Sequence, residues 1–124
     1  WSQGKTPSQA VDDLLFRRSP RLKGHKGGSI ISTDRDLVKQ TVDVITRMNN
    51  TVLRIQGPPG SGKTFTAAKS IAELIQSGKR VGVTSNSHKS VINILRAVHD
   101  ALKSERKKCR IVKVGKTEED PLIE

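Results

Sequence analysis

Eight consecutive residues restrict the possible folds of this chain more than any others. They fit the phosphate-loop (Walker A) pattern G-x-x-x-x-G-K-[ST] and read Gly57-Pro58-Pro59-Gly60-Ser61-Gly62-Lys63-Thr64. A triphosphate concentrates negative charge, and a ring of backbone N–H groups can hold it where glycines let the chain curl at positive φ. A helix that starts directly after such a curl aims its unpaired N–H groups and its positive dipole end at the same anion. The run therefore predicts a site for nucleotide phosphates.

Two side chains of this run have chemistry of their own. Lys63 is placed to reach the outer phosphates, and the Thr64 hydroxyl is placed to ligate Mg²⁺, so both are candidate catalytic residues. Pro58 and Pro59 stiffen the start of the loop and remove two N–H donors from it. We expect ATP (or another nucleoside triphosphate) and Mg²⁺ as ligands. The candidate nucleotide-binding residues in this region are Gly57, Pro58, Pro59, Gly60, Ser61, Gly62, Lys63, Thr64 and Phe65.

Hydrophobic periodicity around the loop alternates between strand-like and helix-like runs. Ser32 or Thr33 is expected to cap a first helix that Asn49-Asn50 ends. Predicted strands and helices then follow in this order: strand 51–56, helix 63–77 with Gly78 as its terminator, strand 80–84, helix 88–103 and strand 110–114. This order predicts an α/β fold of the P-loop NTPase class, with a parallel sheet, flanking helices and an incomplete domain.

The first 31 residues differ in composition from the rest. They are basic, rich in glycine and interrupted by proline, with one brief helical run at residues 10–16. We predict a basic linker or docking arm over residues 1–31 and a partial P-loop NTPase domain over residues 32–124. Because the first residue is Trp1 and not Met, we also expect the chain to be a piece of a longer protein.

The charge balance indicates the class of partner. A formal net charge of +11, from 23 Lys and Arg against 12 Asp and Glu, favours nucleic acid, polyphosphates or anionic surfaces, although a merely basic soluble protein stays an alternative. Cys109 is the only cysteine, which excludes an internal disulfide and fits a reducing, cytoplasmic setting. No apolar run approaches the roughly 18 residues of a membrane span, so no membrane partner is expected.

Three segments resemble motifs of superfamily 1 helicases. Residues 56–64 are similar to the first motif of the 5′-to-3′ branch, and residues 81–91 are similar to motif Ia, where a Ser/Asn-rich turn touches the nucleic-acid backbone. Gln40 stands where the family has a glutamine that reads the adenine edge. The His-Lys form of motif Ia looks most like proteins that fuse a RecB-like nuclease to such a helicase.

The resemblance implies that the chain is the N-terminal part of the first RecA-like motor domain of an ATP-dependent helicase, which couples ATP hydrolysis to translocation on single-stranded DNA or RNA. Gln40 joins the nucleotide-binding residues on this ground. The implied partners are the single strand, the remaining helicase lobe of the parent chain and a fused nuclease. The implied nucleic-acid contacts are Thr84, Ser85, Asn86, Ser87 and His88.

Each implied role has a plainer alternative. Gln40 could be a polar residue on the exposed face of an amphipathic helix, and Ser87 would cap the helix after it in either case. The Asp-Glu pair of motif II is missing, and residues 118–120, although acidic, follow no apolar strand. Hydrolysis depends on such groups, so we expect the chain alone to bind nucleotide and to be nearly inactive.

Two functions of other classes stay open. The chain could be a non-helicase P-loop ATPase, such as a nucleotide-controlled switch or loader, which does not need the turn at residues 84–87. A small-molecule kinase would need a lid of arginines and an acceptor pocket, and the sequence shows neither.

Overall fold

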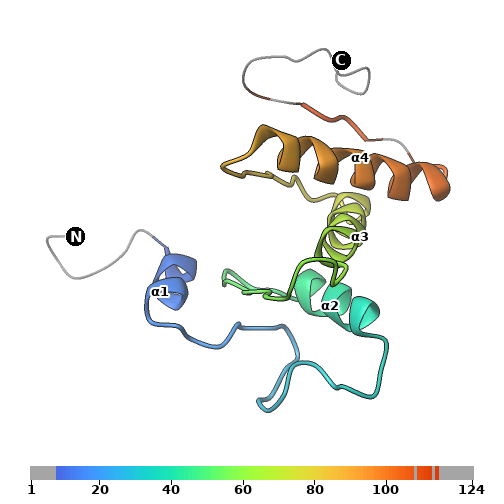
Figure 1. The fold of residues 1–124 in the computed structure, drawn as a ribbon. Helices are drawn as coiled ribbons and strands as arrows, with labels where there is room; N and C mark the ends of the chain where they lie inside the picture. The colour runs from blue at the N-terminus through green and yellow to red at the C-terminus, as the bar shows by residue number, and fades with distance from the viewer. Residues whose placement is uncertain (1–7, 108, 113, 115–124) are drawn as a thin grey trace, which may run out of the picture. The chain divides into compact units, whose positions relative to one another are not determined.

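The computed structural model describes residues 8–107, 109–112 and 114. Its helices are α1 (Gln9–Leu15), α2 (Leu37–Thr46), α3 (Lys63–Gln76) and α4 (His88–Ser104) (Figure 1). The chain divides into two compact units, Trp1–Lys63 and Thr64–Glu124, which are described separately. The division into an arm (1–31) and a domain (32–124) stays a prediction. No helix in the described part of the chain is long and apolar enough to cross a membrane.

The predicted parallel sheet is wrong, because the residues that the structure describes form helices and no strand. Segments 51–56 and 80–84 run as irregular chain, as do the described residues of 110–114, of which Lys113 lies outside the description. Valine and isoleucine fit a pleated, half-buried surface, but a strand exists only when its N–H and C=O groups pair with a neighbour. Among the described residues one isolated antiparallel bridge occurs, between Leu22 and Met48.

The first unit contains α1 and α2. Ser8 caps α1 by accepting a hydrogen bond from the Val11 N–H (3.3 Å), so the predicted helical run at residues 10–16 is confirmed. α2 starts later than predicted, because Asp36 is its N-cap and not Ser32 or Thr33. The Asp36 carboxylate accepts from the N–H groups of Val38 (3.0 Å) and Lys39 (3.1 Å), and an aspartate in this place satisfies two donors that would otherwise lack partners.

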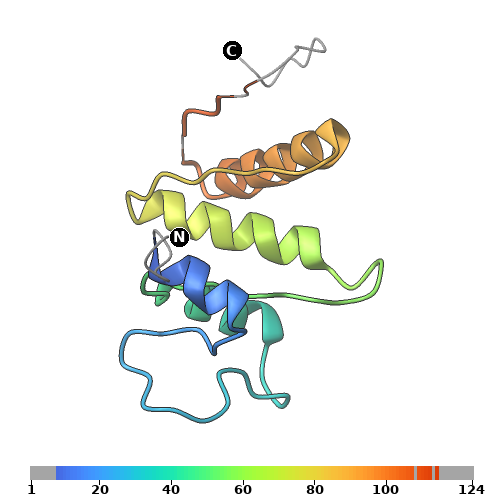
Figure 2. The same cartoon turned by 90° about the vertical axis from the view of Figure 1, so that its left-hand side faces the viewer.

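The second unit is built on α3 and α4, which lie next to each other in both views (Figures 1 and 2). Their shared core consists of Ala68 and Ala72 from α3 and Val98 and Leu102 from α4, all nearly inaccessible to solvent. Alanines on one helix let the larger side chains of the other approach closely, which is how a short chain with few aromatic residues can build a packed core.

The end of α3 confirms the predicted terminator. Gly78 has a φ of 76°, and its N–H donates to the Ile75 carbonyl (2.9 Å) while the next N–H, of Lys79, donates to the Leu74 carbonyl (2.9 Å). This is the Schellman arrangement, in which a left-handed residue returns the chain to the helix's own unpaired carbonyls.

Candidate phosphate-binding loop

The loop is curled by two glycines at positive φ, Gly60 at 77° and Gly62 at 80°. Between them the Ser61 N–H donates to the Pro58 carbonyl (3.3 Å), which closes a tight turn. The chain then enters α3 at Lys63. Only glycine adopts this backbone without strain, so the spacing of glycines in the sequence has its expected geometric consequence.

Gly57 lies close to the middle of the loop. A Cβ atom at this position would lie 2.7 Å from Ser61 Oγ, which is closer than side-chain atoms approach each other. The first glycine thus lets the start of the loop pass directly against its middle. The loop is a compact ring and not an open bend.

The Lys63 ammonium lies over this ring. Its Nζ donates to the carbonyl oxygens of Gly57 (2.7 Å) and Pro58 (2.7 Å), and Ser61 Oγ is at 3.4 Å. An ammonium has three donors, of which the two carbonyls use two at short distance. The third can turn from the distant Ser61 hydroxyl to an anion in the ring. The lysine is solvent-exposed, so an anion can reach it.

Thr64 and Phe65 follow on the first turn of α3, and both are exposed. The Phe65 ring has the Lys69 ammonium 5.8 Å from its centroid and borders a hollow of about 350 Å³ together with residues of α4. The described residues contain no group of three or more His, Cys, Asp and Glu side chains able to hold a metal ion. Thr64 nevertheless fits Mg²⁺, because Mg²⁺ at a nucleotide is held through few protein oxygens and the phosphates themselves.

Gln40 is not a bare surface residue. Its Oε1 accepts from the Ser32 N–H (2.7 Å), and its Nε2 donates to the Ser32 carbonyl (2.9 Å). Both residues border a hollow of about 440 Å³ that residues 29–33 and Gln40 line. One donor and one acceptor side by side is also the pattern that adenine offers to a glutamine amide. Any base that Gln40 reads must therefore share or replace the Ser32 peptide, a partner that the sequence did not indicate.

The turn before α4 has the capping role that was the plainer alternative. Ser87 is the N-cap of α4, where its Oγ accepts from the Ser90 N–H (3.4 Å), and its own N–H donates to Ser85 Oγ (3.2 Å). The other predicted nucleic-acid contacts are exposed: Thr84, Ser85, Asn86 and His88. Thr84, Ser85 and His88 also border a hollow of about 360 Å³ in the second unit, which is lined mostly by apolar residues and by Arg110. Their predicted contact with a single strand stays a prediction.

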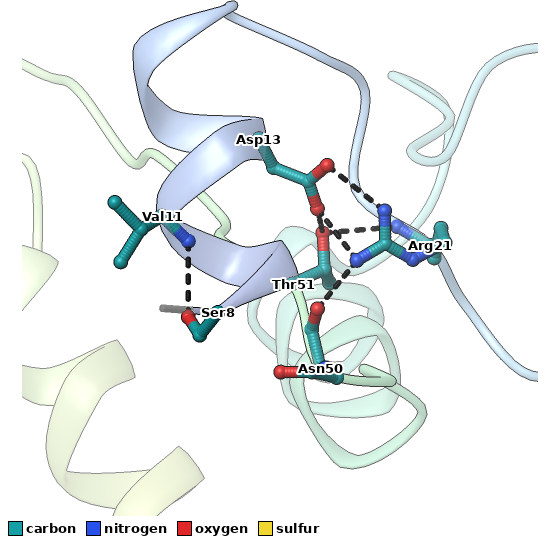
Figure 3. A network of polar contacts seen from close by, with 6 residues as sticks. All are labelled: Ser8, Val11, Asp13, Arg21, Asn50 and Thr51. Atoms are coloured by element: carbon teal, nitrogen blue, oxygen red, sulfur yellow. Dashed lines mark hydrogen bonds and ion pairs between the residues drawn. The ribbon is translucent and has the colours of Figure 1, made fainter. Parts of the chain in front are cut away.

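The first unit contains a polar network that was not predicted from the sequence (Figure 3). Asp13 on α1 is buried, with 1% of its surface exposed, and pairs with Arg21 and Thr51. Hydrogen bonds from Arg21 and then Thr51 hold the pKa of the Asp13 carboxyl below its ordinary value of 3.8. The available signal was an acidic residue inside the short apolar run of α1.

The profile of the AAA-domain family matches residues 33–123, most of the chain, and the chain belongs to that family. The identification as the N-terminal part of a superfamily 1 helicase motor is confirmed. The acidic run at residues 118–120 lies within the match but outside the residues that the structure describes.

Among known proteins, the chain is similar to the DNA replication ATP-dependent helicase/nuclease DNA2 of Saccharomyces cerevisiae. The two are 44% identical over 89 residues, which cover 66% of this chain and 6% of the yeast protein. The chain thus spans a small part of that relative's length. No solved structure matches the chain significantly.

Proposed function

We propose that this chain binds the phosphates of ATP through residues 57–64, as part of an ATP-dependent helicase that moves along single-stranded nucleic acid. The observation that carries the proposal is the ring closed by Gly60 and Gly62 with the Lys63 ammonium above it. Membership of a family of ATP-dependent helicases supports the same ligand.

The chemistry follows from the groups in the ring. Backbone N–H groups at the curl and at the start of α3 donate hydrogen bonds to phosphate oxygens but are uncharged. The Lys63 ammonium supplies a positive charge that balances the negative charge of the phosphates. Bound Mg²⁺, held in part by Thr64, would neutralise charge that develops on the outer phosphates. Residues that activate water are missing from this sequence, so we expect the chain alone to bind ATP and turn it over poorly.

Gln40 is the proposed selector of the base. Its amide has a donor and an acceptor that match those of adenine. In the structure both groups are hydrogen-bonded to the peptide of Ser32. On the same edge guanine presents two acceptors, N7 and O6, so the amide oxygen would face an acceptor and lose its hydrogen bond. A chain that uses Gln40 in this way therefore prefers ATP to GTP.

The proposed track for the single strand is the exposed turn at Thr84–His88. Its hydroxyl and amide groups donate to phosphate oxygens, and such contacts do not depend on base sequence. The yeast relative is named as a DNA replication helicase/nuclease, which supports DNA as the strand and a fused nuclease as a partner in the parent protein. The remaining helicase lobe of the parent chain is the other proposed partner, on the resemblance to superfamily 1 helicases. A nucleotide switch or loader is the less favoured function, since membership of the helicase family argues against it.

Calorimetry with MgATP tests the proposal on the chain as it stands. Lys63→Ala should weaken binding by about 100-fold, on the order of the loss of a charge-assisted contact to a phosphate. Because the lysine is exposed, the far-ultraviolet circular dichroism should not change. Lys79→Ala, an exposed lysine outside the loop, is the matched control. MgATP that binds Lys63→Ala as tightly as the unmutated chain would refute the assignment.

A further inference from the structure

We propose that Asp13, Arg21 and Thr51, here called the Asp13 clasp, position the phosphate loop for nucleotide, so that ATP affinity depends on the N-terminal segment. The inference rests on the proposed function and adds a role for Asp13 and Arg21, which are far from the loop in sequence, and for Thr51, which precedes it. Asp13 is a positioning residue in this account and does not touch the ligand.

Every oxygen of the clasp's carboxylate has a partner (Figure 3). Arg21 Nη1 donates to Asp13 Oδ1 (2.9 Å), Arg21 Nη2 lies 2.7 Å from Oδ2, and the Thr51 hydroxyl donates to Oδ2 (2.7 Å). The Arg21 N–H in turn donates to Thr51 Oγ1 (3.3 Å), and its guanidinium also bonds the carbonyl of Asn50. The forked guanidinium fixes the orientation of the carboxylate as well as its distance.

The buried Asp13 carboxylate is not explained by stability alone. A buried ion pair contributes little more than apolar residues of the same volume would, and losing one partner leaves the other uncompensated. What the arrangement does supply is direction: a bidentate pair plus a hydroxyl tolerates only one placement of Thr51 against α1. The position of Thr51 is therefore specified tightly.

Thr51 opens the segment that leads into the loop. Residues 51–56 have no strand partner in the described part of the chain, so no sheet holds them there. Support comes from the N-terminal segment instead. The Lys23 N–H donates to the Arg47 carbonyl (2.9 Å), the Asn49 N–H donates to the Arg21 carbonyl (3.0 Å), and Leu22 and Met48 form the bridge between them.

These contacts form one continuous fastening between residues 21–23 and residues 47–51, with the clasp at the end nearest the loop. Gly57 lies close to Ser61 in the closed ring, so the direction in which residues 51–56 enter the loop affects whether the ring closes. If Thr51 is released, residues 51–56 can approach the loop in several directions, and conformations in which the ring is open become populated. Nucleotide binding must then order the loop, and the conformational entropy lost in doing so lowers the affinity.

Substitutions at both ends of the clasp test this. Thr51→Val keeps the shape and removes the hydroxyl, and Asp13→Asn keeps the shape and removes the charge. Each should weaken MgATP binding by about tenfold, within the usual range for coupled sites. Thr51→Ser, which restores the hydroxyl, should bind within about twofold of the unmutated chain. Asp43→Asn is the matched control, because its ion pair with Arg47 (3.3 Å) is exposed.

A second measurement uses the unmutated chain and does not depend on the variants folding. Coupling is reciprocal, so MgATP should tighten the clasp as much as the clasp tightens ATP. Hydrogen exchange at the Arg21 N–H, which bonds Thr51, should slow by about tenfold when MgATP saturates the chain.

The outcomes separate the two proposals. If MgATP protects the loop amides while Arg21 exchange is unchanged, or if folded Thr51→Val and Asp13→Asn bind within twofold of the unmutated chain, the clasp has no positioning role. If the unmutated chain itself binds no MgATP, the proposed function is overturned, and the role of the clasp with it.

Discussion

The two side chains that we propose as nucleotide contacts, Lys63 and Gln40, also hold the chain's own backbone. Lys63 donates to two loop carbonyls, and the Gln40 amide pairs with the Ser32 peptide. The Lys63 ammonium is therefore held beside the loop with one donor left to turn, whereas a base at Gln40 must share or replace the Ser32 peptide. For Lys63, such preorganisation lowers the entropy that binding would otherwise cost.

Gln40→Ala is expected to reduce the preference for ATP over GTP. A bidentate amide contact discriminates between bases by about 1–3 kcal/mol, so ATP affinity should fall about tenfold while GTP affinity stays nearly the same. Competition binding with both nucleotides measures this, and inorganic tripolyphosphate, which has no base, is the control ligand. An equal loss for ATP, GTP and tripolyphosphate would mean that Gln40 only holds residues 29–33 in place.

Asp13 should make stability depend on pH in one direction. Its folded-state pKa is lowered, mainly by the hydrogen bond from Arg21 and then by that from Thr51. The stability it contributes is present above its ordinary pKa of 3.8 and is lost as the pH falls through the lowered folded value.

The free energy of unfolding of Asp13→Asn, compared with that of the unmutated chain in denaturant titrations, checks this sign. The difference should be largest near neutral pH and should shrink progressively as the pH falls below 3.8. A difference that stays constant over this range would show that the Asp13 charge does not contribute.

At the scale of elements, helices were predicted well because their signals are local. The predicted helices at 63–77 and 88–103 correspond to α3 (Lys63–Gln76) and α4 (His88–Ser104). Ser87 caps a helix and Gly78 ends one through hydrogen bonds to residues only a few positions away, so the local sequence is enough to predict both. The start of α2 was misjudged because several possible capping residues stand close together, and the structure has Asp36 as the N-cap.

Gly78 should be sensitive to substitution while Gly82 is not. Gly78→Ala places a side chain at a φ of 76°, a left-handed conformation that costs about 1–2 kcal/mol for an L-residue. Gly82→Ala is the control, since no atom lies within 4 Å of a Cβ there and its φ is not positive. Chemical denaturation of both variants gives the two free energies. Equal values would contradict the Schellman ending of α3.

At the scale of the whole molecule, the net charge should determine how the affinity for a single strand depends on salt. A net charge of +11 attracts any single strand, and each phosphate neutralised releases counterions. If the single strand binds as proposed, the logarithm of its affinity should fall linearly as the logarithm of salt concentration rises, with a slope of about −0.7 per phosphate contact.

Fluorescence anisotropy with a labelled oligonucleotide measures this slope. Ser85→Ala should weaken binding without changing the slope, because a hydroxyl carries no charge and releases no counterion. Affinity that does not respond to salt would mean that the positive charge serves another purpose.

The sequence alone was sufficient for the curl of the phosphate loop, the Schellman ending of α3 and the cap of α4. All of these depend on φ preferences and hydrogen bonds between residues only a few positions apart. Tertiary structure alone decided three further features: the pairing of Gln40 with Ser32, the attachment of the N-terminal segment through Asp13 and Thr51, and the absence of strand pairing in the described residues at 51–56 and 80–84. Asp13 and Thr51 are 38 positions apart, and strands likewise need distant partners. Propensity at one position cannot specify which distant group will satisfy it, because that depends on how the whole chain closes.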